Sequence, residues 1–86
     1  MFTKCVERNH EAILKYFYNN PLETPEKPDW FTSSVNTDEG DMVVTIEGLE
    51  TITVPYGDIL VYDDTNKNAS VMTMEEFVDE YQRVDD

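Results

Sequence analysis

The chain has 86 residues and a mass of 10.0 kDa, a length that suits one small domain and leaves no room for a second. It carries 19 acidic and 6 basic side chains, and the resulting net charge of −13 repels nucleic acids and anionic membranes. One cysteine and one histidine exclude an internal disulfide and a two-histidine zinc site.

Residues 9–19 predict a helix. Asn9 is a residue type favoured at helix N-caps, and Asn19, Asn20 and Pro21 would end the helix. The apolar side chains form two i, i+4 pairs, Ile13 with Phe17 and Leu14 with Tyr18. Such pairs are typical of one face of an amphipathic helix.

A proline-rich connection and a second, short helix are expected next. Residues 21–29 contain three prolines and show no periodicity, which predicts an extended segment. Pro28 suits the first turn of a helix over residues 29–35. This helix would carry Trp30 and Phe31 into the core.

From residue 41 onward the pattern becomes that of β-structure. Residues 42–47 and 50–54 are rich in β-branched side chains and predict a hairpin with its turn at Gly48. Residues 59–62 form an unbroken apolar run that predicts a central strand, and residues 69–72 predict a short returning strand.

A capping box begins the last predicted helix, with Thr73 at the N-cap and Glu76 at the third helical position. Phe77, Val78 and Tyr81 are expected on its apolar face. The sequence therefore predicts an α+β fold: a small antiparallel sheet of three to four strands, an N-terminal helix, a short Trp-bearing helix and a C-terminal helix, with the helices on one sheet face.

Few residues are candidates for chemistry. No serine, cysteine or base motif accompanies His10, and Cys5 suits a small buried apolar residue, so we expect no catalysis and no cofactor. Residues 64–75 repeat the oxygen spacing of an EF-hand calcium loop. Ala69 stands where that loop needs glycine, and the preceding segment predicts a strand, which favours a polar loop without metal.

The acidic residues are concentrated in one half of the chain. Residues 38–86 hold fourteen acids and two bases, an excess above the net charge of about 2–8 that solubility requires of a small domain. Carboxylates spread over a compact surface can imitate a phosphate backbone and enter a basic channel. The predicted partner-binding residues are Glu75, Glu76, Asp79, Glu80, Asp63, Asp64, Glu47 and Glu50. An acidic surface that has no target remains the alternative.

Four motifs follow one another along the chain: Pro28-Asp29-Trp30-Phe31, Thr45-Ile46-Glu47-Gly48, Val54 before Gly57-Asp58-Ile59-Leu60-Val61, and Phe77 with Tyr81. This order resembles a family of small uncharacterised proteins of tailed bacteriophages and prophages. The chain departs from that family in a shorter, less basic N-terminal segment and in a polar loop at residues 63–68. A phage origin would place it beside acidic inhibitors of host defence, including anti-CRISPR proteins and other DNA mimics.

The resulting hypothesis is a non-enzymatic, phage-encoded inhibitor that binds a basic host protein in the bacterial cytoplasm. The expected partner is a CRISPR effector or a restriction-type nuclease, and the inhibitor is expected to be a monomer that contacts neither nucleic acid nor membrane. One alternative is a phage protein that sequesters a nucleotide in a pocket involving Tyr56 or Trp30. Another is an accessory virion protein.

Overall fold

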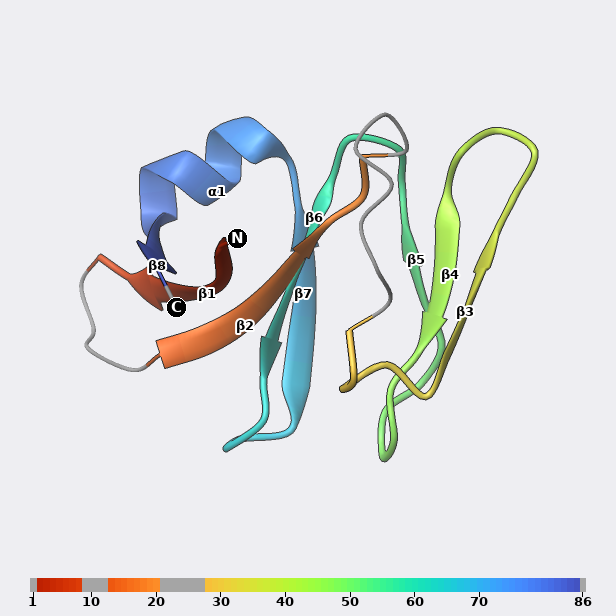
Figure 1. The fold of residues 1–86 in the computed structure, drawn as a ribbon, viewed down its shortest axis with the longest axis horizontal. Coiled ribbons are helices and arrows are strands. Elements are labelled where there is room, and N and C mark those ends of the chain that lie inside the picture. Colours follow the sequence, from red (N-terminus) through yellow and green to blue (C-terminus); the bar gives the residue numbers. More distant parts are fainter. Residues whose placement is uncertain (1, 9–12, 21–27, 86) are drawn as a thin grey trace.

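The computed structural model describes residues 2–8, 13–20 and 28–85, which form two antiparallel β-sheets and one short helix (Figure 1). The larger sheet has the strand order β7-β6-β2-β1-β8. Its strands are β1 (Phe2–Glu7), β2 (Ile13–Tyr18), β6 (Ile59–Asp63), β7 (Asn68–Met72) and β8 (Tyr81–Asp85). The smaller sheet has the order β3-β4-β5. Its strands are β3 (Ser33–Asn36), β4 (Met42–Thr45) and β5 (Ile52–Val54), and helix α1 (Met74–Glu80) connects β7 to β8.

The predicted α+β fold with three helices is therefore wrong, because the described chain is mostly β-structure with a single short helix. That helix has seven residues, whereas about 20 are needed to cross a bilayer. Within the described residues no helix is long and apolar enough to do so. Strands β1 and β8 at the two ends of the chain were not predicted.

The helix predicted over residues 9–19 is wrong, because Ile13–Tyr18 forms β2 in the middle of the larger sheet. Tyr16 is buried on the α1 side of the sheet and Phe17 on the opposite side, as the period of two in a strand requires. A strand that is buried on both faces is apolar at almost every position, so it also satisfies helical spacing. The predicted N-cap, Asn9, lies outside the described residues.

The short helix predicted over residues 29–35 is also wrong. A turn closes there instead, in which the Phe31 N–H donates to the Pro28 carbonyl at 3.1 Å, and β3 follows from Ser33. The core position expected for the aromatic pair is confirmed: Phe31 is buried, and the half-buried Trp30 stacks on Tyr62 with ring centroids 5.2 Å apart.

The predicted strands of the second half are confirmed. β4 and β5 pair as an antiparallel hairpin, and the Leu49 N–H donates to the Ile46 carbonyl at 3.0 Å across the turn. The apolar run at residues 59–62 is β6, which lies between β2 and β7. The returning strand at residues 69–72 is β7.

The capping box of the last helix is confirmed as well. The Glu76 N–H donates to Thr73 Oγ1 at 3.2 Å, and the Thr73 N–H donates to Glu76 Oε1 at 3.4 Å. Phe77 is buried as predicted, but the side chain of Val78 is 46% exposed, so its predicted place on the apolar face is wrong. Tyr81 begins β8, and its ring stacks on Phe77.

The larger sheet is covered on both faces, by α1 on one side and by the smaller sheet on the other (Figure 1). The cluster on the α1 side contains Cys5, Tyr16, Ile59, Val61, Met72 and Phe77. The cluster between the two sheets contains Phe17, Phe31, Met42, Val44, Ile46, Val54, Leu60 and Tyr62. Because β2 and β6 contribute to both clusters, the continuous apolar runs of these two strands are explained.

One buried polar side chain joins the two sheets. Asn19 follows β2 and is 1% exposed, and its Nδ2 donates to the carbonyls of Val54 at 2.9 Å and Gly40 at 3.1 Å. Its backbone N–H also donates to the Asp58 carbonyl. The asparagine predicted to end a helix therefore connects the larger sheet to β5 and to the β3–β4 turn.

Candidate functional site

The eight predicted partner-binding residues do not form one continuous face. Four of them lie on α1, at the C-terminal end of β7 (Figure 1). The other four lie at the opposite end of β7, where Asp63 ends β6, Asp64 follows it in the β6–β7 turn, and Glu47 and Glu50 lie in the β4–β5 turn. The structure thus divides the predicted acidic surface into two groups.

The α1 carboxylates form one compact group. Glu75, Glu76, Asp79 and Glu80 are all exposed. At about 100° per residue the four side chains span an arc of roughly 140° around the helix axis, and the centre of this arc lies about 130° from the buried Phe77. The sheet thus holds the helix so that its acidic side points outward.

The four α1 carboxylates differ in their contacts within the protein. The Glu76 carboxylate accepts hydrogen bonds from the backbone N–H and the hydroxyl of Thr73, so it caps the helix. Glu75, Asp79 and Glu80 form no ion pair with any described residue. Within the described part of the chain, these three exposed carboxylates thus have no basic partner.

Arg8 forms hydrogen bonds with the backbone near the C-terminal end of the same helix. Arg8 donates through Nη2 and Nε to the carbonyl of Val78, at 2.9 and 3.2 Å. A cation at a helix C-terminus complements the negative end of the helix dipole. Arg8 therefore stabilises the C-terminal end of α1, a helix that also contains two like-charge i, i+4 pairs, Glu75 with Asp79 and Glu76 with Glu80.

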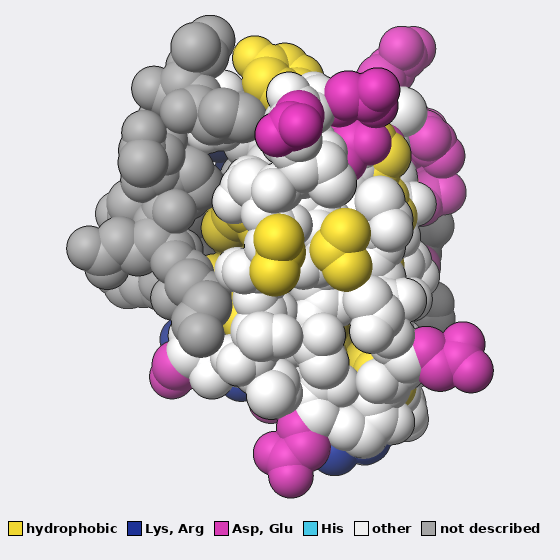
Figure 2. Space-filling model, turned by 90° about the vertical axis from the view of Figure 1, so that its right-hand side faces the viewer, with side chains coloured by type: hydrophobic (Ala, Val, Ile, Leu, Met, Phe, Trp, Pro, Cys, Tyr) yellow, Lys and Arg dark blue, Asp and Glu magenta, His cyan; other side chains and the backbone are white. Residues whose placement is uncertain are grey.

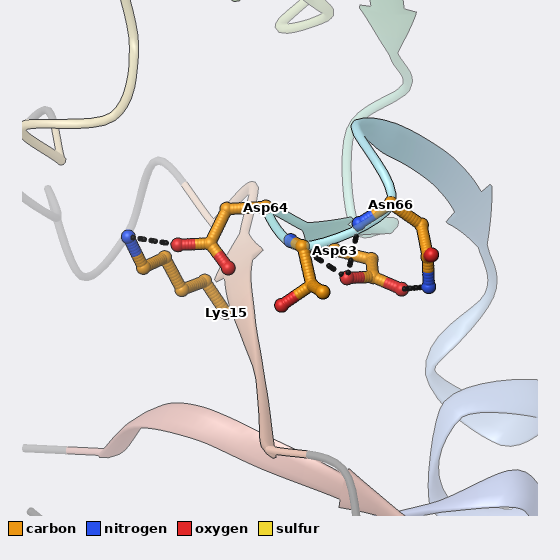
Figure 3. A network of polar contacts seen from close by, with 5 residues as sticks. Lys15, Asp63, Asp64 and Asn66 are labelled. Carbon is orange, nitrogen blue, oxygen red and sulfur yellow. Dashed lines mark hydrogen bonds and ion pairs between the residues drawn. The ribbon is translucent and has the colours of Figure 1, made fainter.

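The carboxylates of the β6–β7 turn are engaged in local contacts (Figure 3). Asp63 accepts from the backbone N–H groups of Thr65 and Asn66 through Oδ1 and from Asn66 Nδ2 at 2.7 Å through Oδ2. Asp64 pairs with Lys15 of β2 at 3.2 Å. Both residues thus have structural partners, which makes them less available to another molecule than the α1 carboxylates.

The hydrogen bonds from Asn66 and Thr65 hold the pKa of Asp63 below its ordinary value. A lowered folded-state pKa means that the ionised carboxylate stabilises the folded turn at pH values above the ordinary one. That contribution is lost as the pH falls through the folded-state pKa.

Glu47 and Glu50 are exposed in the β4–β5 turn. Gly48 and Leu49 lie between them, and Gly48 has a φ of +85°, a conformation that glycine adopts without strain. Glu47 and Glu50 are therefore held by a tight turn at the end of the smaller sheet that is remote from α1.

A pocket between the C-terminal end of α1 and β8 was not predicted from the sequence. It has a volume of about 310 Å³, and its lining includes Arg8, Phe77, Tyr81 and Arg83. Burial and the nearby Glu7 raise the pKa of Tyr81. No local motif could have predicted this pocket, because its two arginines lie near opposite ends of the sequence. They come together only through the pairing of β1 with β8.

The proposed nucleotide pocket at Tyr56 or Trp30 has no counterpart in the contacts of these residues. Trp30 packs against Phe31 and Tyr62. Tyr56 is 50% exposed, and its ring lies against Gly40, where an added Cβ would come within 2.8 Å of Cδ2. Both rings are thus used for packing within the protein.

The geometry of the calcium-like segment differs from an EF-hand loop. Residues 68–72 are extended in β7 and separate Asp64 from Glu75, so the oxygen-bearing side chains do not curl around one point. The described residues contain no group of three or more histidine, cysteine, aspartate or glutamate side chains that could hold a metal ion. His10 lies outside the described residues.

Cys5 is fully buried on β1, as predicted, and burial raises the pKa of its thiol from 9.0 to about 12. We expect the folded protein to react with a thiol reagent at mildly alkaline pH about a thousandfold more slowly than the urea-unfolded chain, because three pKa units reduce the thiolate fraction by that factor. The measurement is the rate of alkylation with and without urea. Equal rates would show that Cys5 is an accessible nucleophile.

The same shift predicts a pH dependence of stability. Because the folded-state pKa is raised, the neutral thiol favours the folded state below about pH 9, and this contribution is lost as the pH rises from 9.0 towards 12. The Cys5→Ala variant should lose less stability over this range, as measured by urea unfolding at each pH. An unchanged pH profile would contradict the assignment.

Comparisons of this chain with protein families, with curated proteins and with solved structures give no match. The resemblance to phage proteins therefore stays a prediction, and the function has to be argued from the geometry of the chain itself.

Proposed function

We propose that the protein is a non-enzymatic inhibitor that binds a basic, nucleic-acid-binding surface of another protein through the carboxylates of α1. The observation that carries the proposal is the outward-facing group on α1, in which Glu75, Asp79 and Glu80 form no ion pair with a described residue. The phage resemblance makes a host defence nuclease, of the CRISPR or restriction type, the first partner to test.

The charge density of α1 supports mimicry of a nucleic acid. Positions 75 and 80 are separated by about 7.5 Å along the helix axis, at 1.5 Å per residue. Four carboxylates over this length amount to roughly one per 2 Å, close to the one phosphate per about 1.7 Å of duplex DNA. A channel that binds a phosphate backbone would therefore meet a similar local charge on α1.

The division into two groups reduces the contact surface that the sequence predicted. The two groups lie at opposite ends of β7, and the carboxylates of Asp63 and Asp64 already have partners within the chain. We therefore assign the binding to α1 and treat Glu47, Glu50, Asp63 and Asp64 as outside the contact.

We expect reversal of charge at Glu75 and Asp79 to weaken binding of the partner by about a hundredfold or more, because each change removes an attraction and adds a repulsion of similar size. Glu76 is left unchanged, since its carboxylate caps the helix. The matched control carries Glu47→Lys and Glu50→Lys, which alter the net charge by the same amount at the other end of the molecule.

The experiment begins with capture of partners from a bacterial lysate on the tagged protein, with elution by increasing salt. Each captured protein is then titrated with the wild type, the α1 variant and the control variant, and duplex DNA is added as a competitor. A captured nuclease that DNA displaces, and that distinguishes the α1 variant from the control, supports the proposal. Equal affinity for both variants contradicts it.

A second candidate function is the binding of a small anionic ligand, favoured by the pocket that brings Arg8 and Arg83 together in a chain with six basic residues. Guanidinium groups beside an aromatic ring suit a nucleotide. A mononucleotide should then raise the melting temperature of the protein, and the Arg83→Gln variant should abolish the rise. The absence of any shift with the wild type would remove this candidate.

A further inference from the structure

The outer face of the smaller sheet is free of charged side chains. Met42, Val44 and Val54 point into the core, so the alternate residues point outward. The outward side chains on the three strands are Ser33, Val35, Val43, Thr45 and Thr53, and this set is called the neutral face below. Figure 2 shows it, with two hydrophobic side chains next to each other at the centre and acidic side chains towards the upper and lower ends.

This absence of charge is unexpected in a chain with 19 acidic residues. Val35 is 65% exposed, the largest exposed fraction among the large hydrophobic side chains that the structure describes, and it lies directly opposite Val43 in the register of β3 and β4. A solvent-facing strand position usually carries a polar residue. The pair is therefore a candidate contact with another molecule.

Strand β3 is an edge strand, paired on one side with β4 and on the other with no strand among the described residues. The Thr37 N–H donates to the Asp41 carbonyl, and the backbone groups of an antiparallel strand alternate in direction. Val35 therefore directs its backbone N–H and carbonyl towards β4, whereas Ser34 and Asn36 direct theirs away from the sheet. None of the four residues of β3 is a lysine, a proline or a charged residue. The strand therefore lacks the side chains that usually prevent an edge strand from pairing with another chain.

Acidic side chains lie beyond both ends of this edge. Asp38 and Glu39 are exposed in the β3–β4 turn, and Glu47 and Glu50 are exposed in the β4–β5 turn. A second copy of the chain that paired through β3 would bring carboxylates against carboxylates, whether the two strands ran parallel or antiparallel. An extended segment with basic residues at its ends would instead place opposite charges together at both ends.

We propose that β3 accepts an extended segment of a partner protein as an additional antiparallel strand, and that this segment has β-branched residues at its centre and lysine or arginine at its ends. Backbone hydrogen bonds to Ser34 and Asn36 would provide the pairing, and contact with Val35 and Val43 would select β-branched side chains. The acidic turns would select the basic ends. The inference does not depend on the proposed role of α1.

The probe is a synthetic peptide that alternates threonine and valine and carries lysines at both ends, compared with a peptide in which glutamates replace the lysines. Amide chemical shifts and hydrogen exchange of the protein are followed during titration. We expect the basic peptide to slow exchange at Ser34 and Asn36 and to bind more weakly as salt is raised. Equal binding of the acidic peptide, or no change at these two amides, would refute the proposal.

Variants locate the site. Val35→Lys should weaken peptide binding by about tenfold or more, because it places a like charge and a polar head at the centre of the contact. The matched control is Val71→Lys, the same change at a 37% exposed valine on edge strand β7 of the other sheet, and it should leave the affinity unchanged. Equal weakening by both variants would refute a site at β3.

Two further measurements separate the alternatives. Asp79→Lys on α1 should leave peptide binding intact, because α1 is not part of the site at β3. The peptide proposal and the proposed function of α1 can therefore succeed or fail independently of each other. Sedimentation of the protein alone tests for a second copy. Concentration-dependent dimers that Val35→Lys abolishes would replace the peptide proposal with self-association through β3.

Discussion

Replacement of Asn19 with aspartate is expected to destabilise the protein by about 3–5 kcal/mol, because it buries a carboxylate without a partner. The Asn19 amide nitrogen donates to the carbonyls of Gly40 and Val54, and the side chain is 1% exposed. An ionised carboxylate at this position would face two carbonyl oxygens and could donate to neither. The link between the two sheets would then be replaced by electrostatic repulsion.

The effect is measured by urea unfolding followed through the fluorescence of Trp30, the only tryptophan of the chain. The control is Asn36→Asp, the same change at an exposed asparagine, which should alter stability by less than about 0.5 kcal/mol. Acidification should recover part of the lost stability in the Asn19 variant, since the protonated acid regains a donor. A loss as small as that of the control would show that Asn19 does not join the sheets.

Replacement of Phe77 with alanine is expected to cost about 3–5 kcal/mol and to release α1 and β8 from the larger sheet. Phe77 is 1% exposed, and its ring lies 4.9 Å from that of Tyr16 and 5.6 Å from that of Tyr81. It is the only residue of α1 that is fully enclosed by the core. The cavity would therefore separate the helix from the sheet that orients its carboxylates.

Hydrogen exchange would locate this effect. Amides of α1 and β8 should lose protection in the variant before those of the smaller sheet, whose core lies on the other face of β2 and β6. If Phe77→Ala does not fold, Phe77→Leu keeps most of the volume and should show the same order with a smaller loss. Val78→Ala serves as the control, because Val78 is 46% exposed on the neighbouring position. Uniform loss of protection across both sheets would contradict separate stabilisation of α1.

The Phe77 variants also bear on the proposed function. The partner-binding carboxylates act only as long as α1 is held with its acidic side outward, and Phe77 and the capping box of Thr73 and Glu76 hold it there. A binding defect in a Phe77 variant would therefore report a displaced helix, whereas a defect in the Glu75 and Asp79 variant would report the contact itself.

The misassigned N-terminal segment shows where sequence reasoning failed. Ile13–Tyr18 has the apolar spacing of a helix, and nothing local indicates that both of its faces will be covered. The two clusters that cover it come from α1 and from the smaller sheet, which are formed by residues far along the chain. The aromatic residues of this segment favour a strand, but the local sequence is also compatible with a helix. The distant contacts determine that the segment forms a strand.

The strands β1 and β8 were missed for a related reason. Tyr81–Asp85 is rich in polar residues and extends the sheet edge by pairing with β1, with Cys5 opposite Arg83 and Glu7 opposite Tyr81. An edge strand is held mainly by backbone hydrogen bonds and does not need alternating apolar and polar side chains. Its sequence therefore gives little indication of a strand.

Local chemistry was enough to determine the β4–β5 hairpin, the central strand β6, the returning strand β7 and the capped helix α1, because turn glycine, β-branched runs and the capping box act over a few residues. It also determined the acidity, the buried Cys5 and the core positions of Trp30 and Phe31. Only the tertiary structure decided that residues 13–18 form a strand, that Asn19 joins two sheets, and that the predicted acidic surface separates into α1 and two remote turns. The physical reason is that charge is a property of composition, whereas the face on which a charge lies depends on which distant strands and helix pack together.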